Sequence, residues 1–406
     1  MSSFVEYRLP ELLKFIVDNR GRTCPTSDDG IPLIATNCVK DGHFYPVFEN
    51  VRHVDSVTYK NWFRSHPEPG DILFVCKGSP GRIAMVPDPV TFCIAQDMLA
   101  LRADETIIDN RYLYYLLKSR DTQDKIANLH VGTMIPHFKK GDFGKLALSV
   151  HSTLSEQRAI AEVLGALDDK IAANTKLAET LSQTLSASYQ KVVGSPEAFV
   201  PFSDLVTVTK GISYRSVDLT ESTTALVTLK SFDRTGGYSP RGLKEYSGPY
   251  KPQQVIRPGE LVVAQTDLTQ AAEVVGRAVR VPASNRHSTL AASLDLAIVR
   301  PIGDEPEEFL LGTMLQGRFR THCQSLTSGT TVLHLKSDAI QSFMAPLVSR
   351  EIQLQYAALA RPMLHLGDSI RGENETLAAN RDTLLPQLMS GKLRVKDIEN
   401  TMGEMV

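Results

Sequence analysis

Cysteine is scarce in this chain of 406 residues, and no two cysteines have the spacing of a metal or redox motif. The five cysteines are scattered and odd in number: Cys24, Cys38, Cys76, Cys93 and Cys323. This usage is typical of reduced thiols that pack as small hydrophobic side chains in a cytosolic protein. It argues against a disulfide framework and against a structural zinc site.

Long hydrophobic runs are also missing. No stretch approaches the ~18–20 consecutive apolar residues that a membrane-spanning helix needs. The N-terminus lacks a basic region followed by an apolar segment, which a secretory signal would require. We therefore expect a cytoplasmic protein without a membrane partner.

Catalytic motifs are absent too. An adenine methyltransferase would need an Asn/Asp-Pro-Pro-aromatic motif for the flipped base and a glycine-rich turn for its cofactor, and neither occurs. There is no Walker A loop and no His-Glu-x-x-His zinc motif. Residues 78–81, Gly-Ser-Pro-Gly, lack the Lys-Ser/Thr that follows in a phosphate-binding loop, so a turn between two strands is the better interpretation. We expect no catalysis, no cofactor and no metal on this chain.

An excess of positive charge, which a simple DNA-binding protein would need to neutralise phosphates, is not present. The formal net charge is -2, and residues 1–150 and 194–348 each carry as many basic as acidic residues. Two explanations remain compatible with DNA binding: folding segregates the charges onto separate faces, or a partner supplies the phosphate contacts.

What the chain does contain is an internal repeat. Residues 130–139 align without gaps on residues 327–336, with identical Gly, Thr, His and Lys at four positions. Two fainter matches lie upstream: residues 69–75 match 258–264, and residues 97–102 match 295–300. A repeat of this length predicts one fold built twice, so that two related surfaces are presented at a fixed separation.

The segments between these anchors differ. We align Lys77-Gly-Ser-Pro-Gly-Arg82 in the first half with Gln265-Thr-Asp-Leu-Thr-Gln270 in the second. A common scaffold with divergent loops suggests that one fold recognises two different targets.

Each half predicts a mixed α/β domain of the α+β class. In the first half, strands are expected near 31–35, 72–75, 82–86 and 98–101, before a helix near 110–119. In the second, strands are expected near 225–229, 261–264, 274–281 and 295–299, before a helix near 306–315. We divide the chain into domains at 1–150 and 194–348, helices at 151–193 and 349–395, and a tail at 396–406.

Each domain is followed by a helical pattern with the spacing of a coiled coil. The first hydrophobic seam comprises Ile160, Leu164, Leu167, Ile171, Asn174, Ala178, Leu181 and Leu185. The second comprises Leu359, Met363, Leu366, Ile370, Glu373, Leu377, Asn380 and Leu384. Two seams of matching length favour packing of the helices against each other over packing on their own domains, and the polar members can specify register.

Two prolines interrupt the second pattern. Pro362 and Pro386 each remove a backbone donor and favour a helix start or a kink. The sequence therefore predicts a second helix from near Arg361 to near Leu385.

The first helix resembles the first conserved region of the specificity subunits of type I restriction-modification systems, where a Glu-Gln pair precedes a helix with Ile-Ala and Leu-Asp. Here these are Glu156-Gln157, Ile160-Ala161 and Leu167-Asp168, and residues 384–395 resemble the usual ending of that family. The resemblance implies two target-recognition domains that each read half of a split DNA site. It also implies two antiparallel helices that dock two methyltransferase subunits, which carry S-adenosylmethionine, and a complex that restriction subunits can join.

The second helix departs from the family pattern. The glutamate of the first helix is replaced by Leu354, and the Leu-Asp-Asp segment becomes Leu366-Gly367-Asp368. The second docking surface is therefore expected to be weaker or differently shaped. The resemblance implies partner contacts at Glu156, Gln157, Asp168, Gln355 and Asp368.

Base recognition needs side chains that present donors and acceptors to the groove edges. In the first half, the candidates for DNA contact are Lys77, Ser79, Arg82, Thr133, Met134, His137 and Lys139. In the second half they are Gln265, Thr266, Asp267, Thr269, Gln270, Ser328, Thr330, Thr331, His334 and Lys336. For any one of them an ordinary surface position is the alternative, and for His137 and His334 a packed or capping role is favoured.

Two rival functions stay open at this point. The duplicated domains could bind two proteins and never touch DNA bases, as a structural adaptor would. A complete modification enzyme with unfamiliar motifs is the other alternative. The favoured prediction is a non-catalytic subunit that recognises double-stranded DNA at two half-sites.

Overall fold

The computed structural model describes residues 3–21, 23–129, 136–232, 237–268, 270 and 272–397. These residues form two compact units. Unit 1 comprises Met1–Lys176 with Arg371–Val406, and unit 2 comprises Leu177–Ile370. Each unit thus contains one mixed α/β domain and one half of each long helix.

Unit 1 is built on a four-stranded antiparallel sheet with the order β2-β8-β5-β6. A three-stranded sheet, β4-β3-β7, and a two-stranded ribbon, β1-β9, complete its strands. The strands are β1 (Phe4–Arg8), β2 (Leu13–Val17), β3 (Ile31–Ile34), β4 (Arg52–Val54), β5 (Ile72–Val75), β6 (Ile83–Met85), β7 (Cys93–Ile94), β8 (Met98–Ala103) and β9 (Ala147–His151). The helices are α1 (Ser56–Asn61), α2 (Asn110–Lys118), α3 (Arg120–Leu129) and the first part of α4 (Leu154–Val193).

Unit 2 repeats this plan. Its main sheet has the order β11-β19-β15-β17, beside a second four-stranded sheet, β13-β12-β18-β14. A three-stranded sheet, β16-β21-β20, and a ribbon, β10-β22, complete it. The strands are β10 (Phe199–Pro201), β11 (Val206–Lys210), β12 (Thr224–Val227), β13 (Lys244–Glu245), β14 (Val255–Ile256), β15 (Leu261–Ala264), β16 (Thr266–Asp267), β17 (Ala278–Arg280), β18 (Thr289–Ala292), β19 (Leu296–Pro301), β20 (Thr327–Ser328), β21 (Leu333–Leu335) and β22 (Met344–Pro346). Its helices are α5 (Glu307–Met314), α6 (Gly317–Ser325) and the first part of α7 (Arg350–Met389).

Residues at matching positions in the two halves of the sequence form the same kind of arginine–carboxylate ion pair in each unit. In unit 1 the guanidinium of Arg102 on β8 donates to both oxygens of Asp71, at 2.9 and 3.0 Å. In unit 2 Arg300 on β19 makes the same two-pronged contact with Glu260, at 2.6 and 2.9 Å. Both carboxylates are nearly buried, so each needs its arginine partner. The preceding glycines have φ values of +85° and +100°, which explains the Pro-Gly-Asp/Glu pattern.

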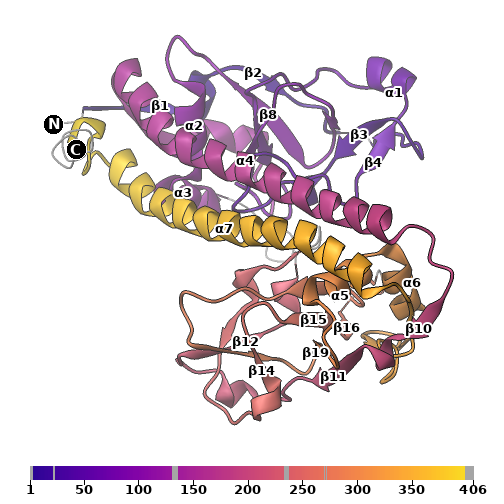
Figure 1. The fold of residues 1–406 in the computed structure, drawn as a ribbon. Helices are drawn as coiled ribbons and strands as arrows, with labels where there is room; N and C mark the ends of the chain where they lie inside the picture. Colours follow the sequence, from indigo (N-terminus) through magenta and orange to yellow (C-terminus); the bar gives the residue numbers. More distant parts are fainter. Residues whose placement is uncertain are drawn as a thin grey trace. The chain divides into compact units, whose positions relative to one another are not determined.

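The two long helices pair in antiparallel fashion, as the resemblance implied (Figure 1). In unit 1 Asp168 of α4 contacts Arg381 of α7, and Asn174, further along α4, contacts Glu373, earlier on α7. In unit 2 the ring of Tyr189 on α4 packs against that of Tyr356 on α7, with centroids 5.2 Å apart. Asn174 and Glu373 are polar members of the two predicted seams, and their contact is of the kind that can specify register.

The predicted seam of α7 is wrong at alternate positions. Leu359 and Leu366 are 43% and 45% exposed, whereas Ala360 is 1% and Arg381 4% exposed. Met363, Ile370, Leu377 and Leu384 are buried or half-buried as predicted. The observed seam therefore uses Ala360 in place of the adjacent Leu359, and Arg381 in place of the adjacent Asn380. Small or polar residues occupy these positions, so the apolar pattern alone did not reveal them.

The predicted start of the second helix at Arg361 is also wrong. Helix α7 begins at Arg350 and passes through Pro362 without a break. Proline in a helix interior costs about 3 kcal/mol. The stretch around Pro362 is held by a buried cluster that includes Tyr189, Phe309, Tyr356 and Ala360, and this packing outweighs the missing hydrogen bond.

Two further findings concern absences. In the described ranges, no three His, Cys, Asp or Glu side chains gather as metal ligands would. None of the described helices combines the length and hydropathy that a bilayer crossing demands.

Candidate nucleic-acid interface

In unit 1 the loop at residues 77–82, which differs between the two halves, pairs with the repeated segment at residues 136–139. Lys77, just after β5, forms an antiparallel bridge with His137. Two backbone hydrogen bonds support it, from Phe138 N–H to Cys76 O at 2.8 Å and from Gly78 N–H to Pro136 O at 3.0 Å. Cys76 N–H in turn donates to Asp97 O at 2.8 Å. We call residues 77–82 and 136–139 the first loop cluster.

Unit 2 builds the same arrangement from different residues. Thr266 on β16 pairs with His334 on β21, and Leu335 N–H donates to Gln265 O at 2.8 Å. Gln265 N–H donates to Asp295 O at 2.8 Å, as Cys76 does to Asp97 in unit 1. We call residues 265–270 and 327–336 the second loop cluster.

These hydrogen bonds correct the sequence alignment of the loops by one residue. Gln265 occupies the backbone position of Cys76, and Thr266 that of Lys77. The alignment of Lys77 with Gln265 is therefore wrong. The same register follows when the match of residues 69–75 with 258–264 is continued without a gap, because its shift of 189 residues places residue 76 on residue 265.

The first loop cluster carries exposed cations. The Lys77 side chain is 46% exposed, with its ammonium 3.9 Å from Asp97. Arg82 is 41% exposed and forms a 3.0 Å ion pair with Asp41. Ser79 and His137 are half-buried, and Lys139 is exposed. Thr133 and Met134 lie outside the described residues.

The second loop cluster is polar and mostly exposed along the repeated turn. Ser328, Thr330, Thr331, His334 and Lys336 are all exposed, as is Gln270. The Gln270 amide donates to Thr330 O at 2.6 Å and so joins the two segments of the cluster. Gln265 is half-buried, and Thr269 lies outside the described residues.

Two predicted contact residues of this cluster are almost inaccessible. Thr266 is 4% and Asp267 3% exposed. The Asp267 carboxylate accepts hydrogen bonds from the backbone N–H groups of Val274 and Val275, at 2.6 and 3.1 Å. In this conformation Asp267 shapes the loop, and a base contact would require these bonds to break.

Cys76 lies directly beneath the first loop cluster and is fully buried. Burial raises the pKa of its thiol to about 12, with Arg20 partly opposing the shift. A neutral, inaccessible thiol is not a nucleophile at physiological pH.

The predicted partner contacts fall into two groups. Gln157 and Asp168 are 2% and 1% exposed, and their side chains bond within unit 1. Asp168 accepts hydrogen bonds from Arg381 and from the Tyr115 hydroxyl, at 2.5 and 2.8 Å. A partner could reach Asp168 only if this network opened.

The second group is accessible to different degrees. Gln355 is exposed, and the Glu156 side chain is 30% exposed. Asp368 is 25% exposed and forms an ion pair with Arg280 inside unit 2. Tyr115 and Arg381 were not predicted as part of this region.

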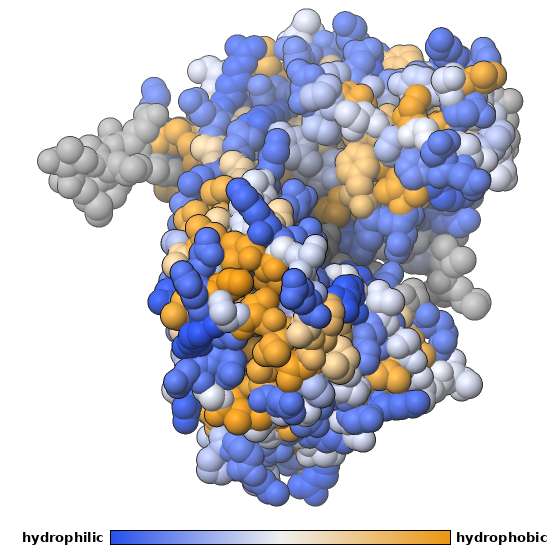
Figure 2. Space-filling model, turned by 45° about the vertical axis from the view of Figure 1, so that its right-hand side comes forward, coloured by the Kyte–Doolittle hydropathy of each residue, from blue (hydrophilic) through white to orange (hydrophobic). Residues whose placement is uncertain are grey.

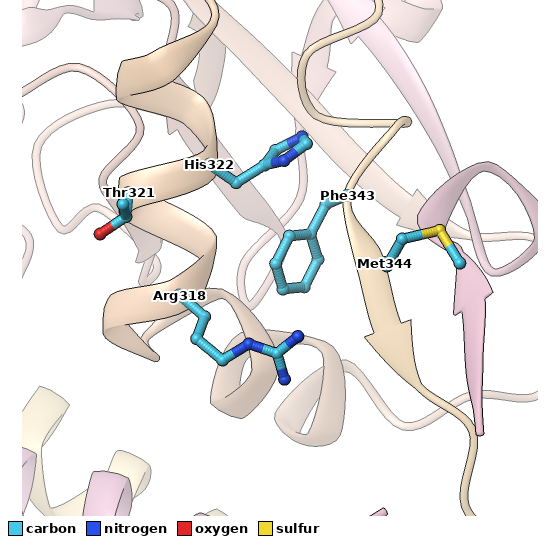
Figure 3. Close-up of a pocket in the computed structure, with 5 residues that line it drawn as sticks. All are labelled: Arg318, Thr321, His322, Phe343 and Met344. Carbon is cyan, nitrogen blue, oxygen red and sulfur yellow. The ribbon is translucent and has the colours of Figure 1, made fainter. Parts of the chain in front are cut away.

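Unit 2 also has a shallow apolar cavity of about 420 Å³, lined by Arg318, Thr321 and His322 of α6 together with Phe343 and Met344 (Figure 3). The Arg318 guanidinium lies 4.8 Å from the centre of the Phe199 ring. Figure 2 shows hydrophobic side chains gathered on the face of unit 2 toward the viewer. None of the residues that line the cavity is a predicted DNA contact, and their arrangement provides no paired acid and base.

Comparison with known proteins identifies relatives of both the sequence and the fold. Residues 3–183 match the family described as type I restriction modification DNA specificity domain. The chain is 22% identical over 395 residues to the type I restriction enzyme MjaVIII specificity subunit of Methanocaldococcus jannaschii, covering 90% of this chain and 87% of that protein. It is 28% identical over 129 residues to the putative type I specificity subunit S.MgeORF438P of Mycoplasma genitalium, covering 32% of this chain and 33% of that protein.

The fold has a solved counterpart. The crystal structure of a type I restriction-modification system S subunit from M. genitalium matches with a TM-score of 0.55 and 17% sequence identity. The match covers 95% of this chain and 96% of that one.

Proposed function

We propose that the chain is a specificity subunit of the type I restriction-modification family, and that it reads a bipartite DNA site as the non-catalytic subunit of a modification complex. The observation that carries this proposal is the repeated loop cluster. Lys77 and His137 in unit 1 occupy the same backbone positions as Thr266 and His334 in unit 2. The backbone arrangement is the same in both units, whereas Lys77 in one unit is replaced by Thr266 in the other. A protein that reads two different half-sites needs this combination.

The two clusters suit different base edges. Lys77, Ser79 and Arg82 offer donors to the acceptors that guanine presents in the major groove. Gln270, Ser328 and Thr330 offer groups that both donate and accept, which suits adenine. Lys139 and Lys336 are exposed at equivalent repeat positions and can hold phosphates on either side without reading sequence.

The balanced charge implies partners. A chain with a net charge of -2 lacks an excess of cations for counterion release, and we infer that other subunits provide most of the phosphate neutralisation. We propose that two methyltransferase subunits, which bind S-adenosylmethionine, dock on α4 and α7, and that nuclease subunits can join. Glu156 and Gln355, near the starts of α4 and α7, are the most accessible of the predicted partner contacts.

A gel-shift titration tests the division of labour. The purified chain alone should bind duplex DNA weakly and with little sequence preference. Addition of the cognate methyltransferase should give tight, sequence-specific binding. Equal specific affinity with and without the methyltransferase would contradict the proposal.

An exchange of loops separates this function from a structural adaptor. Replacing residues 77–82 with the corresponding loop of a relative should change one half of the methylated sequence and leave the other half intact. Methylome sequencing of a host that expresses each variant with the methyltransferase measures this. A protein adaptor would leave both halves unchanged.

A further inference from the structure

One apolar side chain stands out within the polar loop clusters. Leu268 is 68% exposed, and no other large hydrophobic residue among the described residues of either cluster is exposed. It follows directly on β16 and lies between buried Asp267 and exposed Gln270. A leucine side chain can neither donate nor accept a hydrogen bond, so it cannot bind phosphate or the polar base edges.

Hydrogen bonds hold the residues on both sides of Leu268 in place. On one side, the Asp267 carboxylate accepts from the N–H groups of Val274 and Val275 at 2.6 and 3.1 Å, which closes the loop on itself. On the other side, the Gln270 amide donates to Thr330 O at 2.6 Å, which fixes the loop to the repeated turn. These contacts limit the entropy that Leu268 would lose on meeting a ligand.

The major groove of DNA presents one apolar group on its base edges, the C5-methyl group of thymine. If the second loop cluster reads bases, as proposed above, the apolar Leu268 side chain is matched to that group and to no other part of the edges. We propose that Leu268 determines part of the specificity of unit 2 by contacting a thymine methyl group in its half-site. The inference rests on the proposed function and extends it to one residue and one base.

The repeat supplies an internal contrast. Val75 N–H donates to Arg82 O in unit 1, and Ala264 N–H donates to Arg277 O in unit 2, so the loop that carries Leu268 is six residues longer than its counterpart. The first loop cluster, in the residues that the structure describes, exposes no large hydrophobic side chain. The thymine contact is therefore expected from this loop in unit 2 and not from its counterpart in unit 1.

The test uses the chain assembled with its cognate methyltransferase and a duplex that contains the methylated sequence. Each thymine of the half-site read by unit 2 is replaced in turn by deoxyuracil, which removes only the C5-methyl group. Burying one methyl group contributes about 0.8 kcal/mol, so the wild-type complex should bind about fourfold more weakly at one of these positions. The Leu268→Ala complex should bind thymine and deoxyuracil equally at that position.

Two control variants accompany Leu268→Ala. Ile302→Ala removes a similarly exposed apolar side chain of unit 2, 56% exposed and outside both loop clusters, and should keep the fourfold discrimination. Ser79→Ala changes the first loop cluster in unit 1 and should also keep it. Thermal unfolding of each variant establishes that the exposed substitutions leave the fold intact.

Several results would overturn the inference. A half-site for unit 2 that contains no thymine on either strand excludes it at once, as does equal deoxyuracil discrimination by the wild-type and Leu268→Ala complexes. Loss of methyltransferase assembly in Leu268→Ala would show that the leucine docks on protein instead. If the wild-type complex showed no sequence-specific binding, the proposed function itself would fail.

Discussion

The buried ion pair between Asp168 and Arg381 joins α4 to α7 inside unit 1. Their side chains are 1% and 5% exposed, and the guanidinium lies 2.5 Å from the carboxylate. The Tyr115 hydroxyl donates to the second carboxylate oxygen at 2.8 Å. A charge that is buried in this way is tolerated only while its partner is present.

Substitution Asp168→Asn should therefore destabilise unit 1 by about 3 kcal/mol, because it removes the buried counter-charge of Arg381 and leaves only the 62% exposed Asp382 as an acidic partner. Urea unfolding measures the change. The double variant Asp168→Leu/Arg381→Met removes both charges and should recover much of the loss. Equal stability of Asp168→Asn and the wild type would show that the pair is open in solution.

The buried His151 makes the stability of unit 1 depend on pH. Its ring is buried, its Nδ1 lies 2.7 Å from the Tyr112 hydroxyl oxygen, and its Nε2 has no hydrogen-bond partner in the described structure. Burial lowers the pKa of His151, and nearby Glu156 offsets this only in part. Because the folded state resists protonation, this contribution to stability is complete above the unfolded pKa of ~6.5 and decreases as the pH falls below it.

We predict that the urea midpoint of the wild type falls between pH 7.5 and pH 5.5, and that His151→Gln shows a smaller fall. Chemical denaturation at the two pH values measures both. The same pH dependence in His151→Gln would assign the effect to other groups.

At the scale of elements, the register of the helix pair decides which residues of α7 matter for stability. Ile370 is 5% exposed in the seam, whereas Leu359 is 43% exposed beside it. Ile370→Ala should cost about 2–5 kcal/mol through lost burial and a residual cavity. Leu359→Ala should cost less than about 1 kcal/mol.

Thermal or chemical unfolding of the two variants tests this register. Both remove an apolar side chain from the same helix half, so helix propensity changes in the same direction. If Leu359→Ala were the more damaging variant, the seam predicted from the apolar pattern would be the one formed in solution.

At the scale of the whole molecule, the helix pair is proposed to set the distance between the half-sites. Insertion of one heptad into each helix, after Lys176 in α4 and after Ile370 in α7, preserves both seams. Seven helical residues add ~10.5 Å, which corresponds to about three base pairs of DNA. The spacer in the recognised sequence should lengthen by about that amount, as methylome sequencing would show.

Insertion into α4 alone is the matched control. It shifts one seam against the other and should reduce stability and methylation together. An unchanged spacer in the paired variant would refute the role of the helices in spacing.

Much of this architecture could be predicted from the sequence. The repeated Pro-Gly-Asp/Glu and strand arginine indicated a common scaffold, and the structure shows why. Asp71 and Glu260 are buried carboxylates that follow glycines of positive φ, and each is paired with the partly exposed arginine of a strand, Arg102 or Arg300. Two long helices were predicted from heptad spacing, and both are present. Their antiparallel sense came from the family resemblance and not from the pattern.

By itself, the sequence determined that one fold occurs twice, that each copy ends in a long helix, and that the loops between the shared anchors diverge. Only the tertiary structure decided that Ala360 and Arg381 enter the seam while Leu359 and Leu366 stay exposed, and that the Asp267 carboxylate turns inward to accept hydrogen bonds from Val274 and Val275. The reason is physical. Periodicity records the hydrophobicity of a residue, whereas burial depends on the surface opposite it, and backbone register depends on hydrogen bonds between segments distant in the chain.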